Sequence, residues 1–171
     1  SAGDLNGDGY SDVVVGAYRI WKSYIFYGGP NMDATADVSL TAPGVNPYFG
    51  ISVSSAGDVN KDGFSDVMIG TSEIPTHGGK AFVYFGGISM NSTEDITLSG
   101  GGPTNFFGSS VSEAGDVNGD GNADLIIGEP GSNSSTGGAS IYYTSSPSIK
   151  PNLVSIKDVP NDQGGFVKIK W

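Results

Sequence analysis

A nine-residue segment rich in aspartate, asparagine and glycine occurs three times in this chain. The copies read DLNGDGYSD at residues 4–12, DVNKDGFSD at residues 58–66 and DVNGDGNAD at residues 116–124, at spacings of 54 and 58 residues. Positions one, three, five and nine always carry a side-chain oxygen, and position six is always glycine. Because a repeat of this period indicates repeated structural units, the 171-residue chain is predicted to contain three similar supersecondary units.

Each copy is followed by a short apolar run that ends at a glycine. The runs, residues 13–15, 67–69 and 125–127, are mostly β-branched, which predicts buried strands. In the most complete unit four strands are predicted, at residues 51–55, 66–69, 81–85 and 96–98, between clusters of Gly, Pro, Asn and Ser. With 28 glycines and no long helical period, the chain is predicted to be all-β, and four antiparallel strands per unit are typical of a propeller blade.

The oxygen pattern of the repeated segment is that of a calcium-binding loop. EF-hand loops place oxygen ligands at alternate positions around a hard cation and require glycine at position six. Here the last acidic residue is Asp at position nine rather than Glu at position twelve, and strands flank the loop instead of helices. The main-chain carbonyl of position seven can supply a further oxygen. The sequence therefore predicts three Ca²⁺ sites, with the ligands Asp4, Asn6, Asp8, Tyr10 and Asp12; Asp58, Asn60, Asp62, Phe64 and Asp66; and Asp116, Asn118, Asp120, Asn122 and Asp124.

The alternative is that these segments are turns without a metal. Asp, Asn and Gly are common turn residues because they bond to their own backbone and tolerate left-handed conformations. Three copies that keep oxygen at all four positions favour metal binding over turn formation alone.

Further motifs recur at constant positions relative to the loops. Phe-Gly precedes loops two and three, a Gly-Ala-Pro-like element follows every loop, and an aromatic-Gly-Gly turn follows the third strand of the first two units. They are Phe49-Gly50 and Phe107-Gly108; Gly16-Ala17-Tyr18, Gly70-Thr71-Ser72 and Gly128-Glu129-Pro130; and Tyr27-Gly28-Gly29 and Phe85-Gly86-Gly87, with Tyr143-Thr144 in the third unit. Over residues 1–146 the pattern resembles the FG-GAP repeat of integrin α-subunits and of bacterial surface and secreted proteins. This resemblance implies a β-propeller whose blades carry calcium loops.

The resemblance also divides the chain into blades. Repeats are predicted at about residues 1–46, 47–104 and 105–146, followed by a linker at 147–152 and, at 153–171, the start of a domain that resembles a fibronectin-type-III-like β-sandwich, with Trp171 in its core. Closed propellers have about four to eight blades, so the chain is expected to be the C-terminal part of a larger propeller. The first repeat lacks its Phe-Gly strand, and the fourth strand of the last blade is expected to come from upstream sequence. The missing blades of the parent chain are thus expected partners.

Composition excludes several classes of function. The formal net charge is −10, and nine of the 18 acidic residues are loop aspartates, while Arg19 and seven lysines are too few for a nucleic-acid surface. There is no Cys, so disulfides and thiolate metal sites are excluded. No apolar stretch has the length of a membrane span, which predicts no membrane insertion. Weak calcium loops fill only where calcium is millimolar, which favours an extracellular or cell-surface location.

The sequence offers no convincing catalytic set. His77 is the only histidine and lies in a polar turn, and the sequence contains no Gly-x-Ser-x-Gly pattern that could supply a nucleophile. Glu73 and Glu129 follow equivalent glycines and could form an acid/base pair, but solvated loop positions are the favoured interpretation. This chain is therefore predicted not to be an enzyme, whereas the activity of its parent protein stays open.

Aromatic residues are the remaining candidates for binding. Tyr18, Trp21 and Tyr48 with Phe49 could form a platform for a sugar or a protein, although aromatic residues in β-proteins mostly pack between sheets, which is the favoured interpretation. The predicted function is a calcium-binding propeller segment of a secreted or cell-surface protein, in which structural Ca²⁺ supports adhesion or recognition of a protein or glycan ligand. The alternative is an accessory or partly catalytic propeller of an extracellular carbohydrate-active enzyme.

Overall fold

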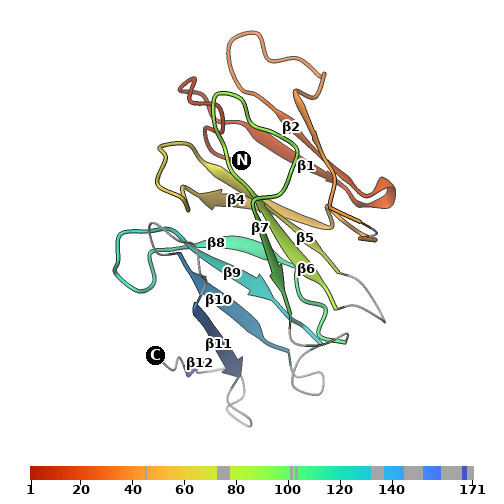
Figure 1. The fold of residues 1–171 in the computed structure, drawn as a ribbon, viewed down its shortest axis with the longest axis vertical. Coiled ribbons are helices and arrows are strands. Elements are labelled where there is room, and N and C mark those ends of the chain that lie inside the picture. Colours follow the sequence, from red (N-terminus) through yellow and green to blue (C-terminus); the bar gives the residue numbers. More distant parts are fainter. Residues whose placement is uncertain are drawn as a thin grey trace.

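The chain folds into three antiparallel β-sheets that follow one another along the sequence (Figure 1). The computed structural model describes residues 1–44, 46–72, 78–100, 102, 104–131 and 137–144, together with the backbone of strands Asn152–Asp158 and Val167–Lys168. The sheets have the strand orders β1-β2-β3, β4-β5-β6-β7 and β8-β9-β10-β11-β12. Since each strand pairs with its neighbour in sequence, the chain is a series of meanders. This is the all-β, partial β-propeller architecture predicted from the sequence.

The strand bounds agree with the predicted apolar runs to within one or two residues. The described part of the chain contains one short 3-10 helix, η1 (Tyr18–Ile20), between the first two strands. The strands are β1 (Val13–Ala17), β2 (Lys22–Phe26), β3 (Val38–Leu40), β4 (Ser52–Gly57), β5 (Asp66–Thr71), β6 (Lys80–Tyr84), β7 (Ile96–Ser99), β8 (Val111–Gly115), β9 (Asp124–Gly128), β10 (Ala139–Tyr143), β11 (Asn152–Asp158) and β12 (Val167–Lys168).

Burial differs between the three repeated strands. Strand β5 is buried along its whole length, as predicted, because sheets pack on both of its faces. The prediction of burial is wrong for β1, where Val13 and Val15 are 37% and 44% exposed. Alternate side chains of a strand point to opposite faces, and only the face of Val14 packs against the second sheet.

Two apolar cores lie between the sheets. One joins the first and second sheets and includes Ile25, Leu40, Ile69 and Phe82. The other joins the second and third sheets and includes Met68, Val83, Phe107 and Ile127. The second sheet therefore contributes one face to each core. The sheets are held together face to face, as the blades of a propeller are.

The Phe-Gly motif fills these interfaces. Phe49 is fully buried, with its ring centroid 5.8 Å from that of Phe82. Phe107 is also fully buried and meets Tyr142 edge-on, with centroids 6.2 Å apart and planes at 81°. Because each phenylalanine precedes the first strand of its own sheet, the motif anchors that strand in the core at the sheet interface.

The glycines of the motifs allow the backbones of neighbouring sheets to meet. A Cβ on Gly70 would lie 2.0 Å from the carbonyl oxygen of Gly108, and a Cβ on Gly16 would lie 2.0 Å from that of Gly50. Gly50 and Gly108 have φ of +86° and +84°, which favours glycine. The Phe-Gly turn of one sheet thus contacts the glycine that ends the apolar run of the sheet before it, which explains why both motifs recur in step.

The first and third sheets do not have the four strands predicted for each blade. The first has three, as expected from its missing Phe-Gly strand, but Gly3 still bridges Asp12. The same pairing closes β4 on β5, between Gly57 and Asp66, and β8 on β9, between Gly115 and Asp124. Residues near Gly3 therefore occupy the position of the last residues of a first strand.

The third sheet has five strands, because β11 pairs with β10 from Ala139↔Ile156 to Tyr143↔Asn152 and β12 pairs with β11. This differs from the expectation that the fourth strand comes from upstream sequence. An open edge at β10 would leave backbone donors and acceptors unpaired, and the apolar run at 153–156 can satisfy them. The boundary of a following sandwich domain stays a prediction, and residues 147–151 and Trp171 lie outside the described residues.

Candidate metal centres

The three aspartate-rich segments lie on the same side of the molecule. Residues 58–66 connect β4 to β5, residues 116–124 connect β8 to β9, and residues 4–12 lead into β1. In Figure 1 these loops project from the left of their sheets, away from η1 and the β1–β2 connection. Their common position follows from the meander, because equivalent connections of successive antiparallel sheets end at the same edge.

Each loop wraps around its first aspartate. Asp4 Oδ1 accepts the backbone N–H groups of Gly7 at 2.7 Å and Asp8 at 3.1 Å, and Asp4 Oδ2 accepts that of Gly9 at 2.9 Å. Asp116 has the same three bonds at 2.7, 3.0 and 2.8 Å. Asp58 accepts the equivalent donors of Asp62 and Gly63 at 3.1 and 2.9 Å. The carboxylate thereby sets the curvature of the loop.

Positions three and five form a second, smaller set of bonds. In the first loop Asn6 Oδ1 accepts the N–H of Asp8 at 3.0 Å, Asn6 Nδ2 donates to Asp8 Oδ2 at 3.0 Å, and Asp8 Oδ1 accepts the N–H of Tyr10 at 2.9 Å. The second and third loops repeat all three bonds at 2.8 to 3.0 Å. Positions one, three, five and seven are thus brought together in every loop.

The ninth-position aspartate is fully buried and ties the loop to the sheet. In the first loop Asp12 Oδ2 accepts the N–H of Leu5 and Asp12 Oδ1 accepts the N–H of Gly28, both at 2.7 Å. Asp66 accepts the equivalent N–H groups of Val59 at 2.8 Å and Gly86 at 2.9 Å. The carboxylate therefore links its own loop to the turn that follows β2 in the first sheet and β6 in the second.

This contact explains the aromatic-Gly-Gly turns, whose role the sequence did not reveal. A Cβ on Gly28 would lie 2.3 Å from the carbonyl oxygen of Ser11, and on Gly86 2.1 Å from that of Ser65. The third unit has Thr144 instead, yet its N–H donates to Asp124 Oδ1 at 3.2 Å, and its hydroxyl donates to the Ala123 carbonyl at 2.6 Å. The backbone bond is kept although the residue changes.

The carboxylates within each loop repel one another. The pKa of Asp66 is raised to about 7; burial is the main cause and the charges of Asp62 and Asp58 add to it, whereas N–H bonds from Gly86 and Val59 act in the opposite direction. Burial is also the main cause that raises the pKa of Asp12 and of Asp124, and the first- and fifth-position carboxylates of the same loop again add to the shift. A cation among these groups would relieve the repulsion.

The donor chemistry of the loops fits a hard cation. The polar side-chain atoms that converge are oxygens, apart from the Nδ2 atoms of the asparagines. An ionised carboxylate has about four lone-pair sites, so the hydrogen bonds that it accepts from backbone N–H groups leave capacity to bind a metal. Asn122 Oδ1, in the third loop, is buried without a hydrogen-bond partner. The described residues contain no preassembled group of three or more His, Cys, Asp or Glu side chains around a common point. Metal binding by the 15 predicted ligand residues therefore stays a prediction that requires the side chains to close further.

Neighbouring loops contact one another across the sheet interface. Ser65 N donates to the Asp4 carbonyl at 2.9 Å, and Gly87 N donates to that of Leu5 at 2.7 Å. A Cβ on Gly7 would lie 2.5 Å from the ring of Phe64. The first and second loops therefore form one connected surface, which no local sequence pattern indicated.

Lys61 is the residue that breaks the glycine pattern at position four. It has a φ of +60°, whereas Gly7 and Gly119, at the same place in the other loops, have +77°. Burial raises the pKa of Asp120, but bonds from Asn122 and Asn118 and the charge of Lys61 outweigh it and lower the pKa. The Lys61 side chain therefore acts on the neighbouring loop.

We expect Lys61→Gly to be more stable than Lys61→Ala by about 1 kcal/mol. A Cβ in the left-handed region costs about 1–2 kcal/mol, which glycine avoids. Part of this advantage is lost because glycine has more conformational freedom in the unfolded chain. Both substitutions remove the charge, so their difference isolates the backbone term. Urea unfolding of the two variants in EGTA measures it. Equal free energies of unfolding would show that the loop carries no strain at this position.

The catalytic candidates gain no support from the described residues. Glu129 is partly exposed and accepts hydrogen bonds from Ser140 Oγ and, at 3.3 Å, from Asn105 Nδ2, so its partners lie within its own repeat. His77 and Glu73 lie outside the described residues. In the part of the chain that the structure describes, no helix is long and apolar enough to cross a membrane.

Comparison with known families agrees with the repeats and the fold. Residues 4–69 match the family model described as "FG-GAP-like repeat", and residues 107–142 match that described as "FG-GAP repeat". The chain belongs to the FG-GAP repeat family. Both matched segments include an aspartate loop and the strand that follows it, so the motifs read from the sequence are those of FG-GAP repeats.

The curated relatives of this FG-GAP chain are much longer proteins. Integrin alpha-5 of Xenopus laevis is 30% identical over 90% of the chain, which corresponds to 17% of that integrin. Integrin alpha-PS5 of Drosophila melanogaster is 31% identical over 76% of the chain and 14% of its own length. Phosphatidylinositol-glycan-specific phospholipase D of Bos taurus is 34% identical over 76% of the chain and 18% of its length. The chain thus spans less than a fifth of each of these relatives.

Proposed function

We propose that the three aspartate loops bind Ca²⁺ as a structural ion and that the chain is a propeller segment of an extracellular or cell-surface recognition protein. The observation that carries the proposal is the buried ninth-position aspartate, which burial and the two other carboxylates of its loop disfavour as an anion. Three negative charges held within nine residues need a counter-charge, and oxygen-rich loops select hard cations.

The ion would act through the link between loop and sheet. Asp12, Asp66 and Asp124 each bridge their own loop and the residues that follow β2, β6 and β10, respectively. A bound cation would hold these carboxylates ionised and in place, and so would stiffen the edge of each blade. The connections on the opposite edge could then be presented with a smaller loss of entropy on binding.

The recognition role and the location are supported by the integrin alpha relatives, whose names identify them as integrin subunits. We infer a protein or glycan ligand, with the remaining blades of the parent protein as intramolecular partners. The exposed outer face of the first sheet, with Val13 and Val15, is consistent with a further blade.

A second candidate is an accessory propeller of an extracellular enzyme. It is supported by the similarity of this chain to relatives named phosphatidylinositol-glycan-specific phospholipase D, a name that describes an enzyme. The described residues supply no nucleophile with a base, so catalysis would belong to another part of such a protein.

Calorimetric titration of metal-stripped chain with CaCl₂ tests the metal proposal. We expect three binding events with dissociation constants of ~10 μM to ~1 mM, in the range of sensor-type and extracellular calcium sites. We expect MgCl₂ to bind much more weakly, because Mg²⁺ requires six oxygen ligands in octahedral geometry at shorter distances than Ca²⁺ does. Absence of heat and of any calcium-dependent protection of the loop amides from hydrogen exchange would reject the proposal.

A further inference from the structure

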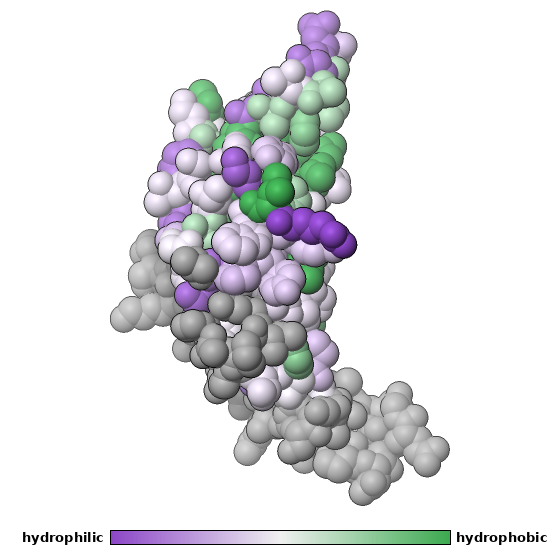
Figure 2. All heavy atoms as spheres, turned by 90° about the vertical axis from the view of Figure 1, so that its right-hand side faces the viewer, coloured by the Kyte–Doolittle hydropathy of each residue, from purple (hydrophilic) through white to green (hydrophobic). Residues whose placement is uncertain are grey.

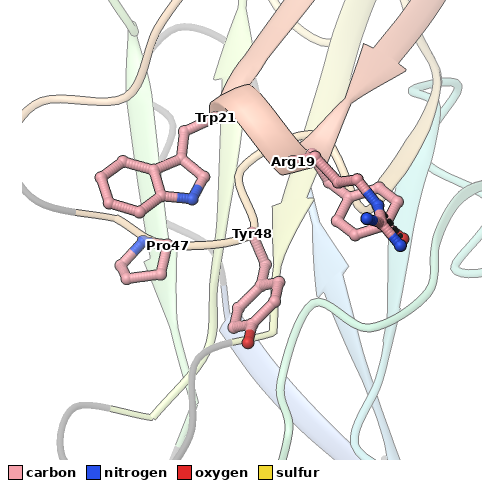
Figure 3. A pocket seen from close by; sticks show the side chains of 5 residues that line it. Arg19, Trp21, Pro47 and Tyr48 are labelled. Carbon is pink, nitrogen blue, oxygen red and sulfur yellow. Dashed lines mark hydrogen bonds between the residues drawn. The ribbon is translucent and has the colours of Figure 1, made fainter.

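A pocket of about 520 Å³ lies on the edge of the sheets opposite the aspartate loops, and its lining residues are Tyr18, Arg19, Trp21, Pro47 and Tyr48. The first three belong to η1 and the connection to β2, and the last two precede β4. In Figure 3 Trp21 and Pro47 lie on one side of Tyr48 and Arg19 lies on the other. The pocket thus lies where the first sheet meets the second, and two connections that are distant in sequence build it.

The aromatic residues of this pocket are not core residues. The sequence favours packing for all four aromatic residues of this region, and the structure confirms this only for Phe49, which is fully buried. Tyr18, Trp21 and Tyr48 are 38%, 48% and 44% exposed. Figure 2, which faces this edge, shows apolar and hydrophilic side chains side by side over the upper half of the molecule. Large apolar groups gathered at one exposed place indicate a binding surface.

The backbone holds Trp21 in a costly conformation. Its φ is +57°, in the left-handed region, where a bulky side chain is disfavoured and glycine is the usual residue. Tyr48 and Phe106 directly precede the two Phe-Gly motifs and have similar φ values of +62° and +56°. The left-handed conformation of Tyr48 is therefore a property of the Phe-Gly turn. Core packing does not account for an exposed tryptophan at such a position. Strained residues concentrate at functional sites, and here the strain displays the indole ring.

Arg19 supplies the only charge in the pocket lining. Its Nε donates to Tyr18 Oη at 3.4 Å, and its guanidinium carbon lies 5.9 Å from the centre of the Tyr18 ring. Within the described residues no carboxylate pairs with it, although the chain carries a net charge of −10. The remaining guanidinium N–H groups are free to bind a planar anion such as a carboxylate in bidentate geometry.

We propose that this pocket binds a saccharide that carries a carboxylate, with the sugar ring against the aromatic faces and the carboxylate on Arg19. The negative face of an aromatic ring attracts the weakly positive C–H groups of a pyranose, while the tyrosine hydroxyls and the indole N–H can bond its hydroxyls. The volume is in the range of about 300–1,000 Å³ typical of small-ligand sites. Trp21 also lines an adjoining hollow of about 220 Å³ with Lys22, which provides room for a second sugar unit.

An acidic peptide fits this surface less well. Three aromatic rings accompany one cation, so the pocket matches a ligand with one negative charge and a large apolar face. A peptide with several carboxylates would meet one guanidinium in a strongly acidic protein, and repulsion from the rest of the surface would oppose its approach. The inference names the ligand class for the recognition role proposed above and rests on that role, but none of the pocket residues is a predicted calcium ligand.

Calorimetric titration of the full chain with matched sugars tests the inference. Two acidic sugars, cellobiouronate and 3′-sialyllactose, are compared with their neutral counterparts, cellobiose and lactose, and with a capped tetra-aspartate peptide. We expect an acidic sugar to bind at least ~10-fold more tightly than its neutral counterpart, the gain typical of one charge-assisted hydrogen bond. The pair that shows this difference identifies whether a uronate or a sialic acid is the source of the carboxylate.

Three variants separate the roles of the pocket residues. Arg19→Gln is expected to abolish the ~10-fold preference for the acidic sugar and to leave the neutral sugar unchanged. Trp21→Gly removes the ring at a position whose φ suits glycine, so the fold is retained, and both sugars should weaken by ~10-fold. Ile88→Ser, at a side chain that is 83% exposed and outside the pocket, is the control and should change neither.

Each outcome either supports or overturns the inference. Equal affinity for acidic and neutral sugars, no binding of any sugar, or tighter binding of the peptide would overturn it, as would sugar binding that survives both pocket substitutions. Titrations in calcium and in EGTA distinguish this inference from the metal proposal: sugar binding by a chain that shows no calcium heat would reject only the latter.

Discussion

Removal of calcium with EGTA is expected to destabilise this chain more than any single substitution. If each site has a dissociation constant of ~10 μM and free calcium is ~1 mM, binding to the folded state alone contributes ~2.7 kcal/mol per site. Three sites would then contribute ~8 kcal/mol, which is comparable to the whole free energy of unfolding of an ordinary domain, ~5–15 kcal/mol. We therefore expect the melting temperature in EGTA to be at least ~10 °C lower than in millimolar calcium, measured by circular dichroism.

Asp62→Asn isolates the contribution of one site. An asparagine at position 62 keeps an oxygen that can accept the Phe64 N–H, bonded at 3.0 Å in the structure, but it lacks the charge that a cation needs. We expect the variant to lose ~2.7 kcal/mol in calcium, and to match or slightly exceed the original stability in EGTA because the repulsion of Asp66 falls.

The matched control is Asp33→Asn, since Asp33 Oδ1 accepts the Thr35 N–H in a similar turn outside the loops. This control should leave the effect of calcium unchanged. If Asp62→Asn lost the same free energy in calcium and in EGTA, the carboxylate would have only a structural role, and the proposed second site would be rejected.

Phe107→Ala is expected to lower the free energy of unfolding by about 3–5 kcal/mol, the usual cost of removing a buried aromatic side chain. Phe107 is fully buried between the second and third sheets and meets Tyr142 edge-on. The backbones of the second and third sheets cannot move closer to fill the cavity left by the ring, because they are already in contact at Gly70 and Gly108. The cavity would therefore persist, and its cost would add to that of the lost contacts.

Urea unfolding of this variant in saturating calcium gives the measurement. Phe106→Ala is the control, because Phe106 is the adjacent aromatic residue but is not fully buried and belongs to neither of the two cores. We expect it to cost about 1 kcal/mol or less. A loss of the same size in both variants would mean that the Phe-Gly motif does not anchor the strand in the interface.

Much of the fold followed from local pattern. The β-branched runs ended by glycine predicted the strands, and the repeat spacing predicted successive sheets, because strand formation and turn geometry depend on neighbouring residues. The loops could also be located residue by residue, since Asp and Gly at fixed positions impose the turn. Calcium binding itself remains a prediction, as do the domain boundaries.

Exposure was harder to predict than secondary structure. Val13 to Val15 and Val67 to Ile69 are similar runs, yet only the second lies between two sheets. The alternation of a strand does not reveal whether both of its faces are covered. Exposure was also not predictable for Tyr18, Trp21 and Tyr48. Their aromatic side chains suggested packing between sheets, but the structure leaves them partly exposed.

The amino-acid order alone determined which segments become strands, where the chain turns and which side chains can offer oxygen to a cation, since these depend on contacts within a few residues. Only the tertiary structure decided that Gly70 meets Gly108, that Ser65 bonds to Asp4, and that Arg19 and Tyr48 share a pocket. The residues in each of these pairs are about 30 to 60 positions apart in sequence. Their proximity follows from the packing of one sheet on the next, which depends on the shape and burial of whole faces and leaves no local signature.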